Sequence, residues 1–424
     1  MAPGVPEATG ESHFPKPPLE NLFTIRFSSA TVAEMNRLTT IRPNQVGQLN
    51  ERQVLRVLQA HGPLSRAEVA RRSGLSAPTV SKAVASLMRA GLLEEAAALE
   101  PVRGRPAPTL RLASERAQVL GVVIDAGHCE VVSAGLDGVL HPKIDAVPTP
   151  GSYEKLLAYL EAVCRERMAR KGVATLGLGL SLPGLLDYRR GVGVLSPNVP
   201  VTNGHTPGKD LGDRLGLECV LLQESHGLCL AERHYGLAVG LDDFALMDVG
   251  TGVGLGVMSG GRILRGHSGL AGELGHMTAV IENGRPCGCG NRGCLETVAS
   301  DAALADRISR RLGRIMTVGE VLELIRSGRA PVAKELLETA RFLAVGVAAV
   351  INLYNPSTVF IHSQLFDADP DLFARLIEFT RERSLPPSFA ECKILRGKGH
   401  KRQGAVAGIV QHLTNAVVPG LEHL

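Results

Sequence analysis

The sequence Gly272-Glu-Leu-Gly-His276, followed by Pro286-Cys-Gly-Cys-Gly-Asn-Arg-Gly-Cys294, decides how this chain is interpreted. It places one histidine and three cysteines close together, in a chain with eight cysteines among 424 residues. Zn²⁺ prefers four nitrogen or sulfur ligands in a tetrahedron, and a set that fills all four positions is typical of structural zinc. The intervening glycines let the backbone turn tightly around an ion. The predicted zinc ligands are His276, Cys287, Cys289 and Cys294.

The alternative for this segment is a loop of free thiols. Neighbouring exposed thiols oxidise readily when no metal holds them, so we favour the metal site. His276 alone would not indicate a metal, and its weight comes from the cysteines that follow it.

The composition is that of a soluble globular protein. Apolar residues make up 44% of the chain and charged residues 21%. No stretch reaches the roughly 18 uninterrupted apolar residues that a membrane span needs. The first 30 residues are polar and lack the apolar core of a signal peptide. The length suggests two or three domains, and we expect a cytoplasmic protein with no membrane partner.

Positive charge is concentrated near the N-terminus. Residues 46–112 contain ten Lys or Arg and five Asp or Glu, whereas the net charge of the whole chain is only +4. A basic module is therefore attached to a nearly neutral body. Residues 1–45 show no sustained periodicity and are predicted to be a mobile tail. The basic module is predicted to span residues 46–113, with structure beginning near Leu49.

Three helices are expected in the basic module. Apolar spacing predicts the first from Asn50 to Ala60, ended by His61-Gly-Pro63. Ser65 and Glu68 form a capping box for the second, which Gly74 ends. Ser76 caps the third helix. Its expected inward side chains are Val80, Val84, Leu87 and Met88.

The short turn between the second and third helices predicts a helix-turn-helix that reads DNA in the major groove. Small polar residues lie outward near the start of the third helix, and a later hairpin around Arg103-Gly-Arg105 resembles a basic wing. A helical dimerisation domain with solvated charges is the alternative, but turn length, caps and wing favour DNA. The predicted DNA contacts are Arg66, Thr79, Ser81, Lys82, Arg103 and Arg105.

The rest of the chain contains a duplicated pattern. An apolar strand from Val119 ends in Asp125-Ala-Gly127, and a second from Phe244 ends in Asp248 and a glycine-rich turn, 123 residues later. Such a repeat predicts two related α/β lobes that face a cleft. Glycine turns can present amides to phosphate, although they are also common in hairpins. The weak phosphate-loop candidates are Gly250, Thr251 and Gly252.

Together the motifs resemble the ROK family of repressors, open reading frames and sugar kinases, from about Val46 to about Leu413. The resemblance rests on the histidine and cysteine segment continued through Leu295-Glu296, and on four shorter motifs. They are Ser181-Leu-Pro-Gly184, Ser196-Pro-Asn198, Asn355-Pro356 and Gly404-Ala405. It implies a winged helix-turn-helix followed by a two-lobed α/β domain, actin-like (ribonuclease H-like) and of the sugar kinase type, over residues 117–424, with a zinc loop at 276–296.

The resemblance also implies that a sugar binds in the cleft between the lobes. His276 would offer its second nitrogen to zinc, so the metal would hold the ring in one tautomer. Carboxylate and amide groups suit hydroxyl groups as hydrogen-bond partners. The sugar-binding residues carried over by matching motif are Asn198, Glu224, Glu273, His276 and Glu296.

The chain departs from the family's kinases at three places. Their Asn-Asp-x-Asn stretch, with a general-base aspartate, is replaced by Gln223-Glu-Ser-His226, which moves the carboxylate of Glu224 outward by one methylene. Such a misplacement, about 1 Å, costs roughly a hundredfold in rate. The Asp-x-Gly-Gly-Thr turn reads Asp125-Ala-Gly-His-Cys129, and His362-Ser363 stands where paired glycines are expected. We therefore expect no catalytic residue beyond a vestigial Glu224, and no ATP cofactor.

We expect a sugar-responsive repressor that binds a double-stranded DNA operator as a homodimer or tetramer. The apolar segment Phe342 to Leu353 suits either a dimer contact or an internal helix. The alternatives are an active ATP-dependent sugar kinase with a DNA-binding module, and a DNA-binding protein without a ligand. The sequence specifies neither the sugar nor the operator, and does not separate repression from activation.

Overall fold

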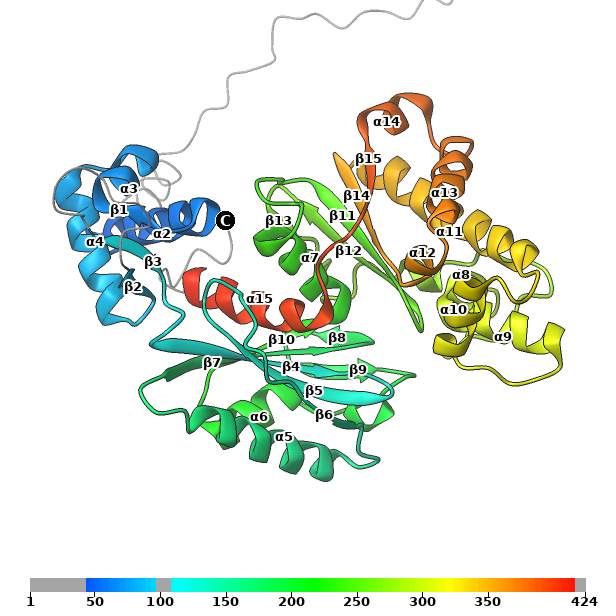
Figure 1. The fold of residues 1–424 in the computed structure, drawn as a ribbon, viewed down its shortest axis with the longest axis horizontal. Helices are drawn as coiled ribbons and strands as arrows, with labels where there is room; N and C mark the ends of the chain where they lie inside the picture. Colours follow the sequence, from blue (N-terminus) through cyan, green and yellow to red (C-terminus); the bar gives the residue numbers. More distant parts are fainter. Residues whose placement is uncertain (1–42, 97–107, 416–424) are drawn as a thin grey trace, which may run out of the picture. The chain divides into compact units, whose positions relative to one another are not determined.

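The computed structural model describes residues 43–96 and 108–415, and Figure 1 shows its ribbon. Residues 1–42 of the predicted tail (residues 1–45) and the predicted wing residues Arg103 and Arg105 lie outside the described residues. Residues 43–45 belong to a helix and not to that tail. The described chain runs through a head (residues 43–96 and 108–113), a first lobe (residues 117–223) and a second lobe (residues 244–396). Its last helix, α15 (Lys401–Asn415), packs on the sheet of the first lobe.

The head is a helix-turn-helix with a small sheet. Its strands pair in the order β1-β3-β2, and Leu93 lies opposite Leu112. The first helix begins at Pro43, before the predicted start near Leu49, because proline suits a first helical turn and the apolar spacing begins only later. The elements are α2 (Pro43–His61), β1 (Leu64–Ser65), α3 (Arg66–Ser73), α4 (Ala77–Arg89), β2 (Leu93–Ala96) and β3 (Thr109–Leu112).

The predicted helix ends of the head are confirmed. The Glu68 amide donates to Ser65 Oγ at 3.3 Å, and the Ser65 amide donates to Glu68 Oε2 at 3.0 Å. Gly74 ends α3 in the left-handed conformation, with φ of 70°. Ser76 caps α4, whose side chains Val80, Val84 and Leu87 are buried, with Met88 partly buried against them.

The two lobes repeat one sheet topology, as the duplicated pattern predicted. In the first sheet the order is β10-β7-β4-β5-β6, and in the second it is β15-β14-β11-β12-β13. In each, the first three strands are parallel and the last two pairings are antiparallel. The strands are β4 (Ala117–Ile124), β5 (His128–Ala134), β6 (Asp145–Pro148), β7 (Ala174–Leu182), β10 (Cys219–Gln223), β11 (Phe244–Val249), β12 (Val253–Ser259), β13 (Arg262–Ile263), β14 (Thr358–His362) and β15 (Lys393–Arg396).

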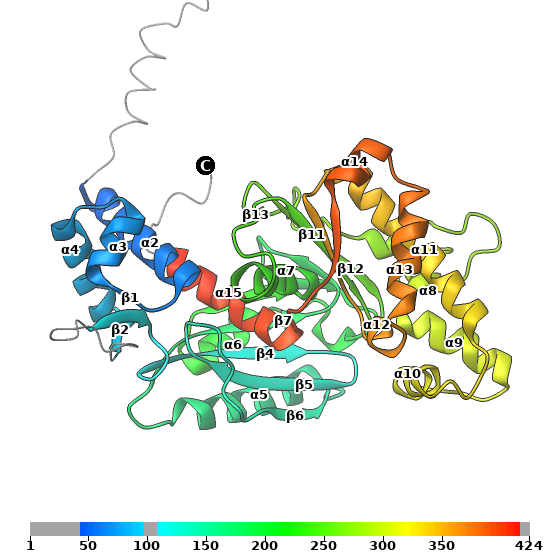
Figure 2. The same ribbon diagram turned by 45° about the horizontal axis from the view of Figure 1, so that its top comes forward.

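Helices cover both faces of each sheet. Helices α5 and α6 cover one face of the first sheet, and α7 and α15 cover the other (Figure 2). Helix α7 also packs on the second sheet, whose far face is covered by α9 to α13. The helices are α5 (Tyr153–Met168), α6 (Pro207–Leu215), α7 (Glu224–Tyr235), α8 (Glu296–Ala299), α9 (Asp301–Leu312), α10 (Val318–Ser327), α11 (Ala333–Tyr354), α12 (Leu365–Ala368), α13 (Asp371–Arg381), α14 (Pro386–Glu391) and α15 (Lys401–Asn415). Smaller elements are β8 (Leu185–Asp187), β9 (Val192–Leu195), η1 (Pro200–Thr202) and η2 (Leu274–His276).

Helices α7 and α15 touch through their backbones. A Cβ added to Gly404 would lie 2.8 Å from the carbonyl carbon of Gly227, and one added to Gly179 would lie 1.8 Å from the carbonyl oxygen of Ala405. No other residue type fits at such distances. The Gly404-Ala405 motif therefore serves the packing of α15 against α7 and β7.

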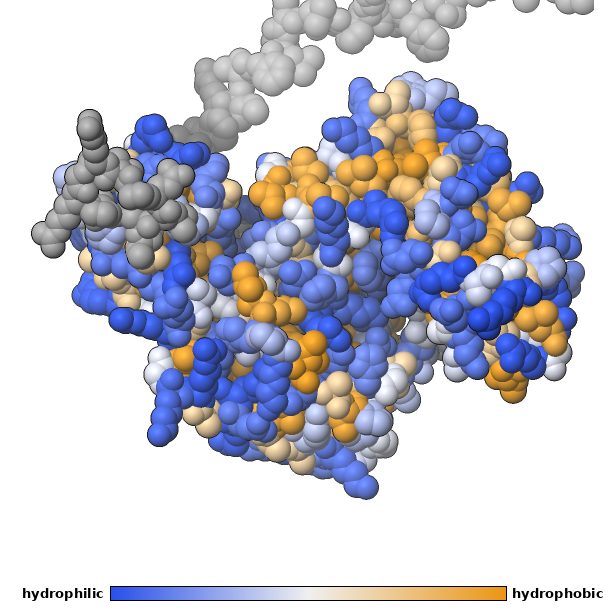
Figure 3. Space-filling view, in the orientation of Figure 1, coloured by the Kyte–Doolittle hydropathy of each residue, from blue (hydrophilic) through white to orange (hydrophobic). Residues whose placement is uncertain are grey.

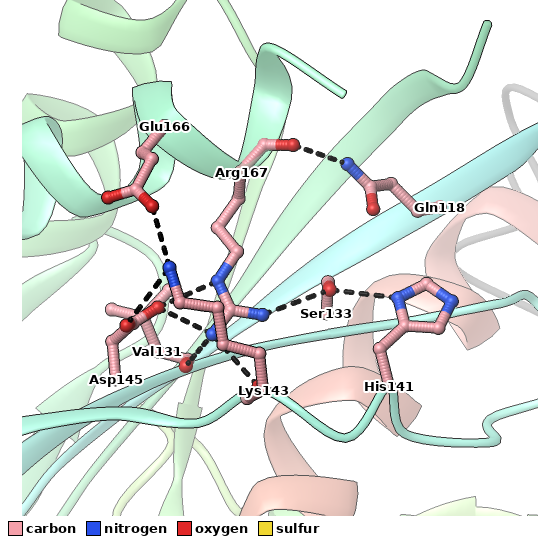
Figure 4. A network of polar contacts seen from close by, with 8 residues as sticks. All are labelled: Gln118, Val131, Ser133, His141, Lys143, Asp145, Glu166 and Arg167. Carbon is pink, nitrogen blue, oxygen red and sulfur yellow. Dashed lines mark hydrogen bonds and ion pairs between the residues drawn. The ribbon is translucent and has the colours of Figure 1, made fainter. Parts of the chain in front are cut away.

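A buried arginine fixes α5 to the first sheet (Figure 4). Arg167, 8% exposed, donates to both Asp145 and the backbone carbonyls of Val131 and Lys143. A further donor meets Ser133 Oγ at 3.3 Å. Because a buried guanidinium is costly unless its donors are paired, this network explains how the charge is tolerated.

The apolar segment around α11 is largely internal. Among the described helices, α11 is the one whose length and composition would suit a membrane span, but 56% of its most apolar window is buried inside the protein, as in a core helix. Leu343, Val347 and Ile351 are fully buried. Leu353 at its end is 74% exposed. Figure 3 shows further apolar side chains gathered over α14 and β15, where Leu385 is exposed.

Candidate functional site

The predicted metal ligands form one cluster. The ligand atoms of His276, Cys287, Cys289 and Cys294 all lie within 4.8 Å of one another. Cys287 Sγ is 3.6 Å from His276 Nδ1, and Cys289 Sγ is 3.7 Å from Cys294 Sγ. A tetrahedron with metal–sulfur distances of about 2.3 Å has edges of about 3.8 Å. The donor set and its spacing therefore fit one tetrahedral metal ion.

The loop that carries the cysteines is shaped by glycines. Gly290 and Gly293 have φ of 95° and 73°, which side chains rarely tolerate. Isolated bridges join Pro286 to Arg292 and Thr278 to Cys294, so the loop folds back on itself. A Cβ added to Gly288 would lie 2.9 Å from Pro197 Cβ, so the loop also packs on the segment that carries Asn198.

One ring nitrogen of His276 faces the cysteines, and the other faces Glu273, a predicted sugar-binding residue. Nδ1 faces Cys287 and lies 3.5 Å from Glu296 Oε1, whereas Nε2 lies 3.7 Å from Glu273 Oε2. A metal on Nδ1 would keep the proton on Nε2. The ring could then donate a hydrogen bond on the side away from the metal.

Two predicted sugar-binding residues, Glu273 and Glu296, lie beside this ring, and Gln223, which was not among the predicted ones, binds one of them. Gln223 Nε2 donates to Glu273 Oε1 at 2.9 Å, and Glu296 lies against the second glycine turn, where a Cβ on Gly252 would be 3.0 Å from Glu296 Oε2. Asn198 is exposed. Its side chain makes no hydrogen bond to any residue of 43–96 or 108–415. The structure thus brings Gln223, Glu273, His276 and Glu296 together, with Asn198 beside the cysteine loop.

His226, which replaces an asparagine of the kinase motif, is buried beneath the cleft. The backbone N–H of Gln223 donates to the Tyr188 hydroxyl at 2.8 Å. That hydroxyl can therefore donate its own proton to His226 Nδ1, also at 2.8 Å. Burial lowers the pKa of His226 to about 4, so the ring is neutral at physiological pH. Tyr188 and His226 thereby position the start of α7.

Glu224, which the sequence predicted to be a vestigial base, is engaged in an ion pair. Lys401 Nζ lies 2.6 Å from Glu224 Oε1 and 2.9 Å from Asp125 Oδ2. Burial raises the pKa of Glu224, and the Lys401 ammonium opposes that rise. Burial also disfavours the ammonium, but the carboxylates of Glu224, Asp248 and Asp125 outweigh it and raise the Lys401 pKa, so Lys401 remains protonated.

The second lobe contributes further polar groups at the ends of its strands β11 and β14. His362, in place of the first expected glycine, lies with Nδ1 2.7 Å from Asp248 Oδ1. Ser363 donates to Asp301 Oδ1 at 3.5 Å. Burial, together with the neighbouring Asp248, raises the pKa of Asp301 to about 7. Both positions that depart from the paired glycines therefore make side-chain contacts.

Some of the predicted DNA-contacting side chains are exposed, whereas others are already paired with residues of the head. Ser81 and Lys82 are exposed on α4. Arg66 is paired with Glu95 of β2 at 2.8 Å, and the Thr79 hydroxyl lies 2.8 Å from that of Ser76 in the helix cap.

The head is joined to the end of α15. Arg52 donates to the backbone carbonyl of Asn415 at 2.8 Å, and Leu413 packs against the head core. Sequence reasoning missed this contact, as it missed Lys401 and Asp301. A long-range partner leaves no local pattern, and each of these residues stands alone in the sequence.

Comparisons with known proteins agree with this arrangement. The ROK family matches residues 124–413, and the winged helix-turn-helix DNA-binding family matches residues 49–94. The chain is 28% identical to the N-acetylglucosamine repressor of Escherichia coli O157:H7 over 395 residues, 89% of this chain and 96% of that protein.

Two solved structures share its fold. One is a ROK family transcriptional regulator, a homologue of the E. coli Mlc protein, with TM-score 0.75 and 26% identity over 88% of this chain and 98% of that one. The other is the ROK hexokinase of Thermus thermophilus, with TM-score 0.59 and 28% identity over 70% and 98% of the two chains. The regulator matches head and lobes together, whereas the hexokinase covers less of this chain.

The raised pKa of Asp301 predicts a pH-dependent stability. In the unfolded chain the Asp301 carboxyl loses its proton above about pH 4, whereas in the folded protein it keeps that proton up to about pH 7. The contribution of Asp301 to the free energy of unfolding therefore falls as the pH rises from about 4 to about 7, and it stays low above pH 7. Asp301→Asn should therefore raise the melting temperature at pH 8, by about 2 °C or more, and change it little at pH 4. Asp371→Asn, at the first residue of α13 but exposed, is the control and should not raise the melting temperature at pH 8. A gain for Asp301→Asn that does not grow with pH would contradict this prediction.

Proposed function

Because the chain belongs to the ROK family, we propose that it is a sugar-responsive transcriptional regulator, and specifically a repressor. The observation that carries the proposal is that one chain joins a helix-turn-helix head to a predicted cleft whose phosphate end is already occupied. This end lies beside the glycine turns after β4 and β11, where Lys401 binds Glu224 and His362 contacts Asp248. The likeness to a repressor named for N-acetylglucosamine supports it. The likeness to a hexokinase supports a sugar as the kind of molecule that the cleft accepts.

We place the sugar beside His276. Glu273 and Glu296 would accept hydrogen bonds from sugar hydroxyls, and the His276 Nε2–H would donate one. Asn198 would contact the sugar from the segment that packs on the cysteine loop. Glu224 would lie at the far edge of the site, where Lys401 already binds its carboxylate.

We propose that the metal is Zn²⁺ and that its role is structural. Four protein ligands leave no open coordination position, and thiolates with imidazole suit zinc. When bound, the ion would cross-link the loop and hold the His276 ring toward the sugar. No ATP requirement is proposed, and the chain is proposed not to be an enzyme.

We propose that α4 enters the major groove of an operator and that Ser81 and Lys82 make its first contacts. Arg66 would need to leave Glu95 to contact a phosphate, whereas Thr79 would act through the helix cap. Arg103 and Arg105 would contact DNA from the wing. A palindromic operator requires two heads, so the protein would act in the cytoplasm as a homodimer or tetramer.

Helix α15 is a physical route between cleft and head. It begins with Lys401 at the cleft and ends at Asn415, which accepts from Arg52 of α2. Glu94 adds a second link, because its buried carboxylate accepts from the amides of Ser114 and Arg116 just before β4. A sugar acts on DNA affinity only if it prefers one arrangement of these elements.

An active sugar kinase remains the second candidate, since Glu224 keeps a carboxylate and the Gly250–Gly252 turn is intact. A coupled ATPase assay with a panel of hexoses separates the two. Hexose-dependent turnover that Glu224→Gln abolishes would replace our proposal with this one.

A melting-temperature screen tests the sugar site. The panel should contain glucose, xylose, N-acetylglucosamine and their phosphates. A ligand at 100 times its dissociation constant stabilises by about 2.7 kcal/mol, and we expect at least one to raise the melting temperature. Glu273→Ala should abolish that rise, whereas Glu282→Ala, an exposed glutamate near the loop, should not. A panel without any shift would favour a DNA-binding protein that has no sugar ligand.

Cys289→Ser tests the metal site. We expect about one zinc ion per chain in the wild type by elemental analysis, and a large loss in the variant, with weaker binding of any sugar found in the screen. Cys392→Ser, outside the cluster, is the matched control and should keep the metal. Normal zinc content in Cys289→Ser would contradict the ligand assignment.

Lys82→Ala tests the DNA interface. On a duplex selected from a random-sequence library, affinity should fall about tenfold, and the melting temperature should stay the same because Lys82 is exposed. Lys171→Ala, an exposed lysine of the first lobe, is the control. Titrations at several salt concentrations should also show a salt dependence reduced by about one phosphate contact if Lys82 binds the backbone. Unchanged affinity would argue against α4 as the reading helix.

A further inference from the structure

We infer that the Lys401 ammonium is a resident cation that occupies a divalent-metal position and closes the phosphate end of the cleft to metal-bound nucleotides. The inference deepens the proposed function of this cleft. Its test, however, uses neither sugar nor DNA, so the two can fail separately.

Two carboxylates contact the ammonium, and a third acts on its charge from nearby. Asp125 follows β4 and Glu224 begins α7, and both contact Lys401 Nζ directly, at 2.9 Å and 2.6 Å. Asp248 at the end of β11 is the third, close enough to act on Lys401 electrostatically. Hard divalent cations such as Mg²⁺ and Mn²⁺ prefer clustered carboxylate oxygens. A cation of this kind would therefore suit the group of carboxylates if Lys401 were absent.

The position of Lys401 in its helix supports this role. Lys401 is the first residue of α15, and a helix N-terminus repels a positive side chain. The attraction between the carboxylates and the ammonium must therefore offset the repulsion between the ammonium and the helix N-terminus. No neighbouring carboxylate on α15 itself does so, since Arg402 and Gln403 follow Lys401. Lys401 is thus held by the cleft and not by its own helix.

The second lobe completes the closure. Asp248 also has a partner from the second lobe, because His362 Nδ1 lies 2.7 Å from Asp248 Oδ1. The divalent ion of a metal-bound nucleotide would have to approach the position that the ammonium holds, and the repulsion between these two cations disfavours binding of that ion. Asp125 and Asp248, which precede the glycine turns after β4 and β11, are thus already paired.

Manganese binding tests the inference on the full-length, zinc-loaded protein. Electron paramagnetic resonance would count bound Mn²⁺ in the wild type and in Lys401→Met, which keeps the length of the side chain and removes its charge. We expect the variant to bind one Mn²⁺ at least tenfold more tightly than the wild type. Adding Glu224→Gln to Lys401→Met should remove that site.

Two controls separate this result from other effects. Lys398→Met removes a nearby lysine that makes no ion pair within residues 43–96 and 108–415, and it should not create a Mn²⁺ site. If Lys401→Met does not fold, Lys401→Gln takes its place, and the wild-type titration still decides. Mn²⁺ binding by the wild type as tight as by the variant would overturn the inference, and so would a variant that gains no site.

Discussion

The structure depends on the backbone contact between α7 and α15. Only glycine at positions 227 and 404 lets the two helices approach this closely, and together they fill the space between the two sheets. Each helix also begins at the cleft, one with Glu224 and the other with Lys401, which bind each other. A change in the cleft that moves either helix must therefore move or strain the other, because packed interiors leave little free space.

The His276 ring makes a comparable connection on the other side of the cleft. Its two nitrogens belong to different environments, one to the cysteines and one to Glu273. A metal site that served only to staple the loop would not need a histidine whose second nitrogen faces a carboxylate. The ring thus explains why the cysteine loop and the proposed sugar residues occur in a single stretch of sequence.

The sequence predicted what local chemistry determines. The cap of α3 by Ser65, the ligand cluster and the repeat of two sheets all follow from residues close in the chain or from a visible period. Lys401 was not predictable, because its two partners lie 276 and 177 residues away and a single lysine has no period. The early start of α2 at Pro43 was missed because the first turn carries no apolar spacing. Contacts made by one residue at long range require the fold.

The two halves of the cleft follow opposite physical requirements. A receptor for a small polar ligand needs unpaired groups, and around His276 the donors and acceptors lie within reach of one another without a strong ion pair between them. At the other end, Lys401 is paired with Glu224, and His362 contacts Asp248. Paired charges gain little from a new ligand, since binding must first break them. Under the proposed function, a sugar would therefore act as a signal here without a phosphate donor beside it. It would change the head only through its preference for one arrangement of α7 and α15.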